Sequence, residues 1–253
     1  MSYSFCVQAK LTATQVKRAL AELADAERAT SLARFFKTGK GEYGEGDRFL
    51  GITVPQQREV AAKYRELSLD QVARLLKSPY HELRSVALAI LALQFKGGQA
   101  DVRQCIFDFY LTQIDKVNSW DLVDASAPYI AGQYLLQRPR EILYQLARSD
   151  KLWERRIAIV STLAFVKTGQ LDDAFAISEM LLGDKHDLIH KAVGWVLRES
   201  GKISRPRQLQ FIADHYSQLP RTALRYAIEH LSPRERKQIL MGDLASLSIP
   251  LRK

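Results

Sequence analysis

One short segment of the chain, NSWDLVDASAPYIAG, combines a large aromatic side chain with two carboxylates. Trp120 and Asp124 are four residues apart, so on a helix they share a face, whereas Asp121 lies on another side. The face of an indole ring attracts positive charge, and a carboxylate adds Coulomb attraction. The pair would therefore suit a cationic or electron-poor ligand. The structural alternative is that Asp124 caps a helix or pairs with a neighbouring arginine, while Trp120 belongs to the core.

Two later segments, LWERRIAIV and KAVGWVLRES, add aromatic and basic side chains. Arg155 and Arg156 are adjacent, so their side chains diverge by about 100° on a helix, and at most one can face a groove directly. Trp195 and Arg198 are three residues apart and share a helix face. Gly194 beside them would let another group approach the helix closely.

The elements that must position these residues are predicted to be helices. Proline and glycine are sparse, with 8 and 13 copies in 253 residues, and apolar residues recur mostly at helical spacing. No stretch alternates between apolar and polar residues as a half-buried strand would. The sequence therefore predicts an all-α fold.

Segments of about 35 residues repeat along this helical pattern. SPYHELRSVALAILALQFK, SDKLWERRIAIVSTLAFVK and GDKHDLIHKAVGWVLRESGK look alike, and IDKVNSWDLVDASAPYIAG fits between the first two. The equivalent marks Pro79, Asp115, Asp150 and Asp184 are separated by 36, 35 and 34 residues, and Pro220 opens a fifth unit 36 residues later. A helix pair at this period indicates an α-solenoid of HEAT-like repeats, which curves and presents a concave face. The alternative is a plain helical bundle.

We expect residues 1–253 to form a single HEAT-like domain, with N-terminal helices and a glycine-rich loop in 1–60 and the repeats in 61–253. LTATQVKRALAELADAERATSLARFF is predicted to form one or two helices. Gly39 to Asp47 carries four glycines and must be a loop. It lacks the GxxxxGK[ST] pattern of a P-loop. Val54 and Pro55 are expected to start the next helix.

Composition points to a polyanionic partner and away from membranes and metals. Lysine and arginine total 37 against 28 acidic residues, a net charge of +9, which favours nucleic acid or an anionic surface. Cys6 and Cys105 form no CxxC pair, so neither a zinc site nor a disulfide is expected, and we expect both thiols to be reduced. We see no signal peptide and no apolar run of the roughly 18 residues that a membrane helix needs.

The segments SWDLVD, LWERRIAI and KAVGWVLRE, in this order and spacing, resemble the AlkD family of DNA alkylation-repair glycosylases. The upstream RFF, FLGI and proline-initiated helix are also similar to that family, and the resemblance runs from about Ala33 to Glu199. It implies excision of N3- and N7-alkylated purines, such as 3-methyladenine and 7-methylguanine, from duplex DNA without deep base flipping.

The resemblance also implies roles for individual residues. Asp124 would be the catalytic carboxylate, Trp120 and Trp195 the paired tryptophans, and Arg156 the arginine that grips the DNA backbone near the lesion. Phe35 stands where the family often has tyrosine, so it keeps the ring and loses the hydroxyl. On the solenoid, Trp120, Asp124, Arg156 and Trp195 are expected to line the concave face.

Three further parts of the sequence receive weaker expectations: two arginines, the glycine-rich insert and Asp121. Arg155 and Arg198 are candidate DNA contacts that flank the groove. The glycine-rich insert from Thr38 to Asp47 departs from shorter family members and would change what the N-terminal helices reach. Substituting Asp121 should be nearly silent if Asp124 alone faces the groove.

The chemistry follows from the substrate. Alkylation at N3 or N7 makes the purine cationic and a good leaving group, so no strong general acid is needed. A carboxylate can stabilise the oxocarbenium-like sugar and position water. We expect no metal or redox cofactor, since His186 and His190 have i,i+4 spacing without a third ligand. The expected partner is double-stranded DNA containing alkylated bases, bound by a monomer in the bacterial cytoplasm or nucleoid.

Two other functions compete with this hypothesis. One is a non-catalytic HEAT-like protein that binds DNA structures, and the other is a protein-interaction scaffold. A pure DNA binder has no use for a carboxylate aimed at a polyanion, so Trp120, Asp124, Arg156 and Trp195 favour the enzyme. A scaffold would need apolar patches and binding that is insensitive to salt.

Overall fold

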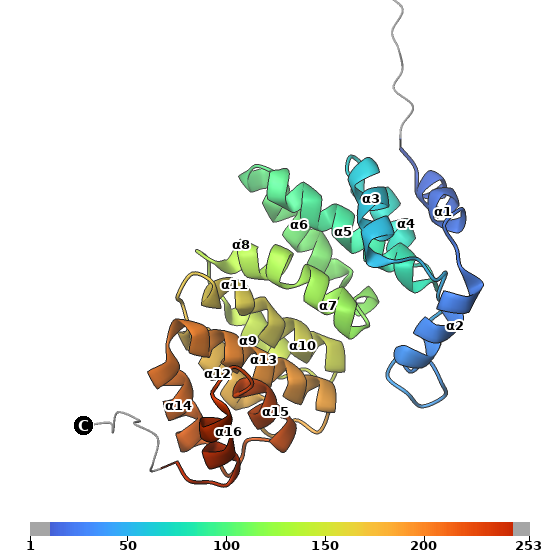
Figure 1. The fold of residues 1–253 in the computed structure, drawn as a ribbon. Coiled ribbons are helices and arrows are strands. Elements are labelled where there is room, and N and C mark those ends of the chain that lie inside the picture. Colours follow the sequence, from blue (N-terminus) through green and yellow to red (C-terminus); the bar gives the residue numbers. More distant parts are fainter. Residues whose placement is uncertain (1–10, 245–253) are drawn as a thin grey trace, which may run out of the picture. The chain divides into compact units, whose positions relative to one another are not determined.

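The structure is a computed structural model that describes residues 11–244, and helices are its regular elements (Figure 1). The described residues contain no β-strand, and an isolated bridge joins Arg48 to Tyr80. The all-α prediction is therefore confirmed. None of the described helices combines the length and the apolar character needed to cross a membrane.

The chain divides into two compact units, and the division falls inside one helix, α7 (Trp120–Ser126). The first unit ends at Leu122 and the second begins at Val123. The sequence also predicts a single domain over residues 1–253 and a curved crescent with a concave face. These two predictions concern how the two units are arranged. Both stay predictions.

The first unit is built from six helices, a 3₁₀ turn and the first residues of α7. Their bounds are α1 Ala13–Ala21, α2 Ala26–Phe35, α3 Val54–Lys63, α4 Leu69–Leu76, α5 His81–Gly97, α6 Ala100–Thr112 and the turn Ile114–Lys116. Capping explains several of the starts, because Thr12 and Thr53 form capping boxes and Asp25 accepts the amide of Arg28. The predicted N-terminal helical segment is thus two helices, and Pro55 lies in the first turn of α3.

A long loop connects α2 to α3, and its glycine-rich part forms no helix, as predicted. Its second half is fixed by Glu82, whose buried carboxylate accepts the backbone amides of Leu50–Ile52 at 2.8–3.3 Å. Gly51 is required there, because its φ is +83° and a Cβ atom would lie 2.1 Å from the carbonyl oxygen of Asp25.

The second unit continues from α7 through a π-helical turn and nine further described helices. Their bounds are η2 Pro128–Gly132, α8 Gln133–Leu135, α9 Glu141–Ala147, α10 Leu152–Ser161, α11 Leu163–Val166, α12 Asp172–Met180, α13 Asp187–Ile203, α14 Arg205–Asp214, α15 Arg221–Ala227 and α16 Pro233–Leu240. The long helix α13 packs against α10, α12, α14 and α15. Gly194 permits the close approach of α15, because a Cβ atom there would lie 2.5 Å from the carbonyl oxygen of Ala223.

A recurring hydrogen-bond motif marks the start of three helices and supports the predicted repeats. In each case a Ser or Asp side chain accepts the amide two residues later, and a basic side chain six residues later contacts its carbonyl oxygen. The three pairs are Ser78 with Arg84, Ser149 with Arg155, and Asp184 with His190. Because the same short-range bonds recur before α5, α10 and α13, these segments are equivalent units of a solenoid-like fold.

Candidate active site

Trp120, the first residue of α7, belongs to an aromatic cluster in the first unit. Its ring stacks on Phe36, with centroids 5.3 Å apart and planes 13° apart, and Phe36 stacks in turn on Phe49 at 5.0 Å. Phe35 meets Trp120 edge-on at 6.0 Å and is 63% exposed. Trp120 is therefore a half-buried member of the cluster, whereas Phe35 presents an apolar ring to solvent.

Beside this cluster lies a network of ionisable groups in which His81, Arg84 and Asp47 are largely buried and Asp121 is partly exposed. His81, the first residue of α5, lies between two carboxylates, with Nε2 2.7 Å from Asp121 Oδ2 and Nδ1 3.2 Å from Asp47 Oδ2. Arg84 Nη2 donates to both oxygens of Asp47 at 2.7 Å. Ser119 Oγ donates to Asp121 Oδ1 at 2.7 Å. The network fastens the end of the glycine-rich loop and the first turn of α7 to α5.

Electrostatics keep His81 charged. Burial by itself lowers its pKa, but the hydrogen bonds to Asp121 and Asp47 outweigh burial and raise the pKa to about 9. Burial likewise acts to raise the pKa of Asp121, but the bond from His81 dominates and holds it below its ordinary value. Asp121 does lie on another side of α7 from Asp124, as expected. That side is bonded to His81 and Ser119, which argues against the expectation that substituting Asp121 is silent.

Asp124 lies in the second unit and forms a two-pronged ion pair with Arg156 of α10. Arg156 Nε lies 3.0 Å from Oδ1 and Nη2 lies 2.8 Å from Oδ2. Arg156 Nη1 donates to the carbonyl oxygen of Leu188 at 2.5 Å. The Asp124 side chain is 21% exposed, whereas that of Arg156 is 5% exposed. The structural alternative, in which Asp124 pairs with an arginine, is thus correct in geometry, yet the carboxylate keeps an accessible edge.

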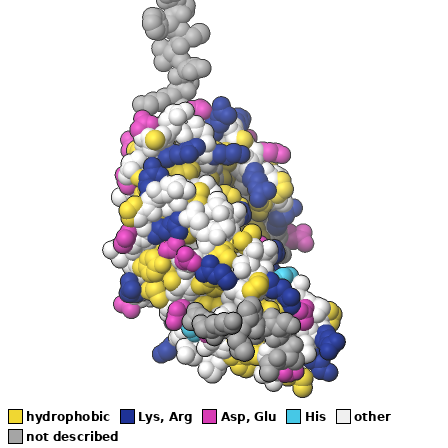
Figure 2. All heavy atoms as spheres, turned by 90° about the vertical axis from the view of Figure 1, so that its left-hand side faces the viewer, with side chains coloured by type: hydrophobic (Ala, Val, Ile, Leu, Met, Phe, Trp, Pro, Cys, Tyr) yellow, Lys and Arg dark blue, Asp and Glu magenta, His cyan; other side chains and the backbone are white. Residues whose placement is uncertain are grey.

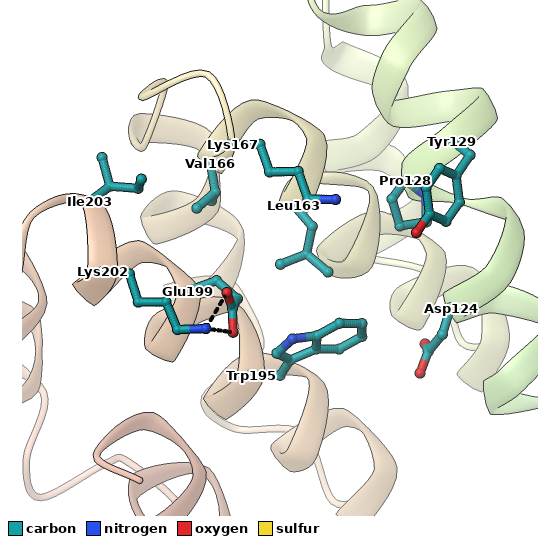
Figure 3. A pocket seen from close by; sticks show the side chains of 10 residues that line it. All are labelled: Asp124, Pro128, Tyr129, Leu163, Val166, Lys167, Trp195, Glu199, Lys202 and Ile203. Atoms are coloured by element: carbon teal, nitrogen blue, oxygen red, sulfur yellow. Dashed lines mark hydrogen bonds and ion pairs between the residues drawn. The ribbon is translucent and has the colours of Figure 1, made fainter. Parts of the chain in front are cut away.

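That accessible edge lines a cleft of about 260 Å³ within the second unit (Figure 3). The cleft is formed by side chains of α7, η2, α11 and α13, together with Lys167 at the end of α11. The lining residues are Asp124, Pro128, Tyr129, Leu163, Val166, Lys167, Trp195, Glu199, Lys202 and Ile203. Trp195 lies between Asp124 and the Glu199–Lys202 ion pair, so an indole ring and a carboxylate line the same largely apolar cleft.

The two remaining predicted arginines do not line this cleft. Arg155 donates from Nε to Asp184 at 2.6 Å and from Nη1 to the carbonyl oxygen of Ser149 at 2.9 Å. Arg198 pairs with Glu199 at 3.3 Å and with Glu229. Arg155 and Arg156 diverge, as expected, because they reach different acidic partners. The structure thus gathers Asp124, Arg156 and Trp195 and leaves Arg155 and Arg198 in ion pairs elsewhere.

Sequence reasoning missed several residues of the site. Tyr129 lies in the segment DASAPYIAG, close to Asp124 in the sequence. The π-helical turn that begins at Pro128 changes which residues share a helix face, so α-helical spacing did not indicate Tyr129. Glu199 and Lys202 carry an i,i+3 charge signal that can be read from the sequence. His81 and Asp47 offered no signal, because their partners lie 34 and 40 residues away.

One face of the molecule carries charges of both signs, and the described residues show no metal cluster. Figure 2 shows lysine and arginine side chains spread over one face among hydrophobic and acidic ones. Within residues 11–244, no group of three or more His, Cys, Asp or Glu side chains could hold a metal ion. Cys105 is a free, exposed thiol, and Cys6 lies outside the described residues.

Comparison with known proteins identifies the family. A family model described as DNA alkylation repair enzyme matches residues 16–231, which is most of the chain. The chain therefore belongs to the DNA alkylation repair enzyme family, and the resemblance found in the sequence is confirmed at that level. No curated protein matches the chain.

A solved structure shares the fold. It is described as a predicted DNA alkylation repair enzyme from Enterococcus faecalis and aligns with a TM-score of 0.63 at 16% identity. The alignment covers 83% of this chain and 97% of that one. At this identity the likeness shows a common fold.

Proposed function

We propose that this protein is a DNA glycosylase that releases positively charged N3- and N7-alkylated purines from double-stranded DNA. Asp124 carries the proposal, because its carboxylate is held by Arg156 and has an accessible edge in a cleft that it shares with Trp195. Membership of the DNA alkylation repair enzyme family supports DNA as the substrate. Monomeric action and a cytoplasmic location remain part of the proposal.

Asp124 would act on the sugar rather than on the base. As the bond between C1′ and the purine nitrogen breaks, its electron pair leaves with the base, which departs uncharged. Positive charge then develops on the sugar, and the carboxylate stabilises it and orients the water that attacks C1′. The proton lost by that water passes to Asp124 or to solvent. The apolar walls strengthen this charge–charge attraction by lowering the local dielectric.

Arg156 receives a different role from the one implied by the resemblance. Its guanidinium is buried and its donors face Asp124 and the Leu188 carbonyl. It has little surface with which to grip a DNA phosphate. A bidentate arginine–carboxylate pair is geometrically specific. We therefore assign Arg156 as a positioning residue that orients the catalytic carboxylate.

The aromatic residues would contact DNA. Trp195 lines the cleft beside Asp124, where its indole face can meet a sugar that becomes positively charged. In the first unit, the exposed ring of Phe35 and the half-buried ring of Trp120 are proposed DNA contacts. Phe35 has no hydroxyl, so its contact would be apolar.

A second candidate function is binding of DNA without catalysis. The observation in its favour is the ion pair between Asp124 and Arg156, since such a pair can be purely structural. Single-turnover release of 7-methylguanine from duplex DNA separates the two functions. Release that depends on Asp124 supports the glycosylase, whereas tight binding without release identifies a binding protein.

A further inference from the structure

The cleft beside Asp124 contains one positive charge that has no acidic partner among the described residues. Of the four charged side chains that line it, Asp124 is paired with Arg156. Lys202 Nζ donates to both oxygens of Glu199 at 2.8 Å. No carboxylate in the described part of the chain lies within the 4.0 Å ion-pair distance of Lys167, which is exposed.

An aromatic ring holds Lys167 at the cleft. Its Nζ lies 5.7 Å from the centroid of the Tyr129 ring, and Tyr129 is 50% exposed. Figure 3 shows the lysine side chain extending across the cleft toward Pro128 and Tyr129. A cation–π contact restricts a lysine side chain while leaving its full positive charge available to an anion. The Lys167 ammonium is therefore positioned at the cleft without being neutralised by a carboxylate.

The substrate class of the proposed glycosylase carries charges of both signs close together. An alkylated nucleotide in DNA has a cationic base, and a phosphate anion lies on each side of its sugar. A carboxylate attracts the reacting sugar but repels these phosphates. A site that brings DNA against Asp124 therefore needs a positive charge for a neighbouring phosphate.

We propose that Lys167, held over the ring of Tyr129, binds the DNA phosphate next to the alkylated nucleotide. The inference rests on the proposed function and adds to it the residue that fixes the DNA backbone at the cleft. Arg156 cannot supply this contact because it is buried against Asp124. Lys202 is already neutralised by Glu199, which makes it the matched control from the same cleft.

The test measures binding without turnover. The probe is a duplex with a single tetrahydrofuran residue, which mimics the sugar and has no base to lose. Dissociation constants of the wild type, Lys167→Gln and Lys202→Gln are measured at several salt concentrations. Lys167→Gln should weaken binding about three- to tenfold and make the slope of log K against log salt shallower by about one. Lys202→Gln should change the slope much less.

A second arm identifies the phosphate. Methylphosphonates, which are uncharged, replace single phosphates on either side of the tetrahydrofuran residue. At one position the replacement should weaken DNA binding by the wild type, because Lys167 then has no charged phosphate to contact. The same replacement should leave DNA binding by Lys167→Gln unchanged, because that variant has no lysine to lose the contact. Tyr129→Leu should show part of the Lys167→Gln effect, whereas Tyr129→Phe should behave like the wild type because the ring is kept.

The inference and the proposed function can fail separately. Equal slopes for Lys167→Gln and wild type, or equal methylphosphonate losses in both proteins at every position, would overturn the lysine contact. Release of 7-methylguanine by the wild type is scored in a separate reaction. Absence of release together with the expected Lys167 pattern would reject the glycosylase and keep the phosphate-binding site.

Discussion

The guanidinium of Arg156 contacts both carboxylate oxygens of Asp124, with Nε 3.0 Å from Oδ1 and Nη2 2.8 Å from Oδ2. The two residues are 32 positions apart and come from different helices, α10 and α7. The pair fixes the direction in which the carboxylate edge faces the cleft. A substitution of either residue therefore also changes the hydrogen-bond partners of the other.

Asp124→Asn should abolish most base release while DNA binding is kept. The amide is nearly isosteric but lacks the negative charge that stabilises the sugar, so we expect a loss of roughly 10²–10³-fold, the size typical of a lost electrostatic contribution. Affinity for DNA should hold or improve, because one negative charge leaves a surface that meets a polyanion. Single-turnover release of 7-methylguanine and binding to undamaged duplex are the measurements. Wild-type release from the variant would show that the carboxylate is structural.

Arg156→Gln should reduce base release strongly and leave the salt dependence of DNA binding unchanged. The glutamine cannot make the two-pronged contact, so Asp124 is no longer fixed. Removing one member of a largely buried pair also destabilises the fold, here by about 2–4 kcal/mol. Release, urea unfolding and the salt slope are measured on the same preparation. A slope shallower by one unit with release intact would restore the role of Arg156 as a phosphate contact.

The stability of the protein should fall in alkaline solution because of His81. Its pKa is raised from 6.5 to about 9 in the folded state. A group with a raised folded pKa contributes its full stabilisation below pH 6.5, and that contribution is lost as pH rises through 9. The free energy of unfolding should therefore drop by up to about 3 kcal/mol between pH 6.5 and 10. Urea unfolding across this range checks it.

The matched variant for this prediction is His81→Gln, which bonds to carboxylates without titrating. Its stability should be lower than that of the wild type near neutral pH and nearly flat across the same alkaline range. If wild type and variant lose stability in parallel, the titrating group is not His81.

Asp121→Asn should destabilise the fold and should not behave as a silent neighbour of Asp124. Asp121 accepts hydrogen bonds from His81 and Ser119, and its loss leaves a buried imidazolium with Asp47 as its remaining carboxylate partner. We expect a loss of about 2–3 kcal/mol in the free energy of unfolding. Asp172→Asn is the better inert control, because Asp172 is 90% exposed. Identical unfolding of the two variants would contradict the importance of the buried network.

The sequence by itself determined the helices and their repetition. Apolar spacing, capping residues and the period near 35 residues are local, because a helix face depends only on the residues within a few turns. The hydrogen-bond motif from Ser149 to Arg155 is an example of such local structure, because each of its hydrogen bonds spans at most six residues. The glycine-rich loop was predictable for the same reason.

Only the tertiary structure decided which side chains meet across helices. The pairing of Asp124 with Arg156 and the position of His81 between Asp47 and Asp121 join residues 32 to 40 positions apart. Spacing along one helix places a side chain on a face, but the rotation and offset of the neighbouring helix select its partner. That is why Arg156 was expected at a DNA phosphate and is found buried against a carboxylate, while Lys167 remains unpaired among the described residues and available at the cleft.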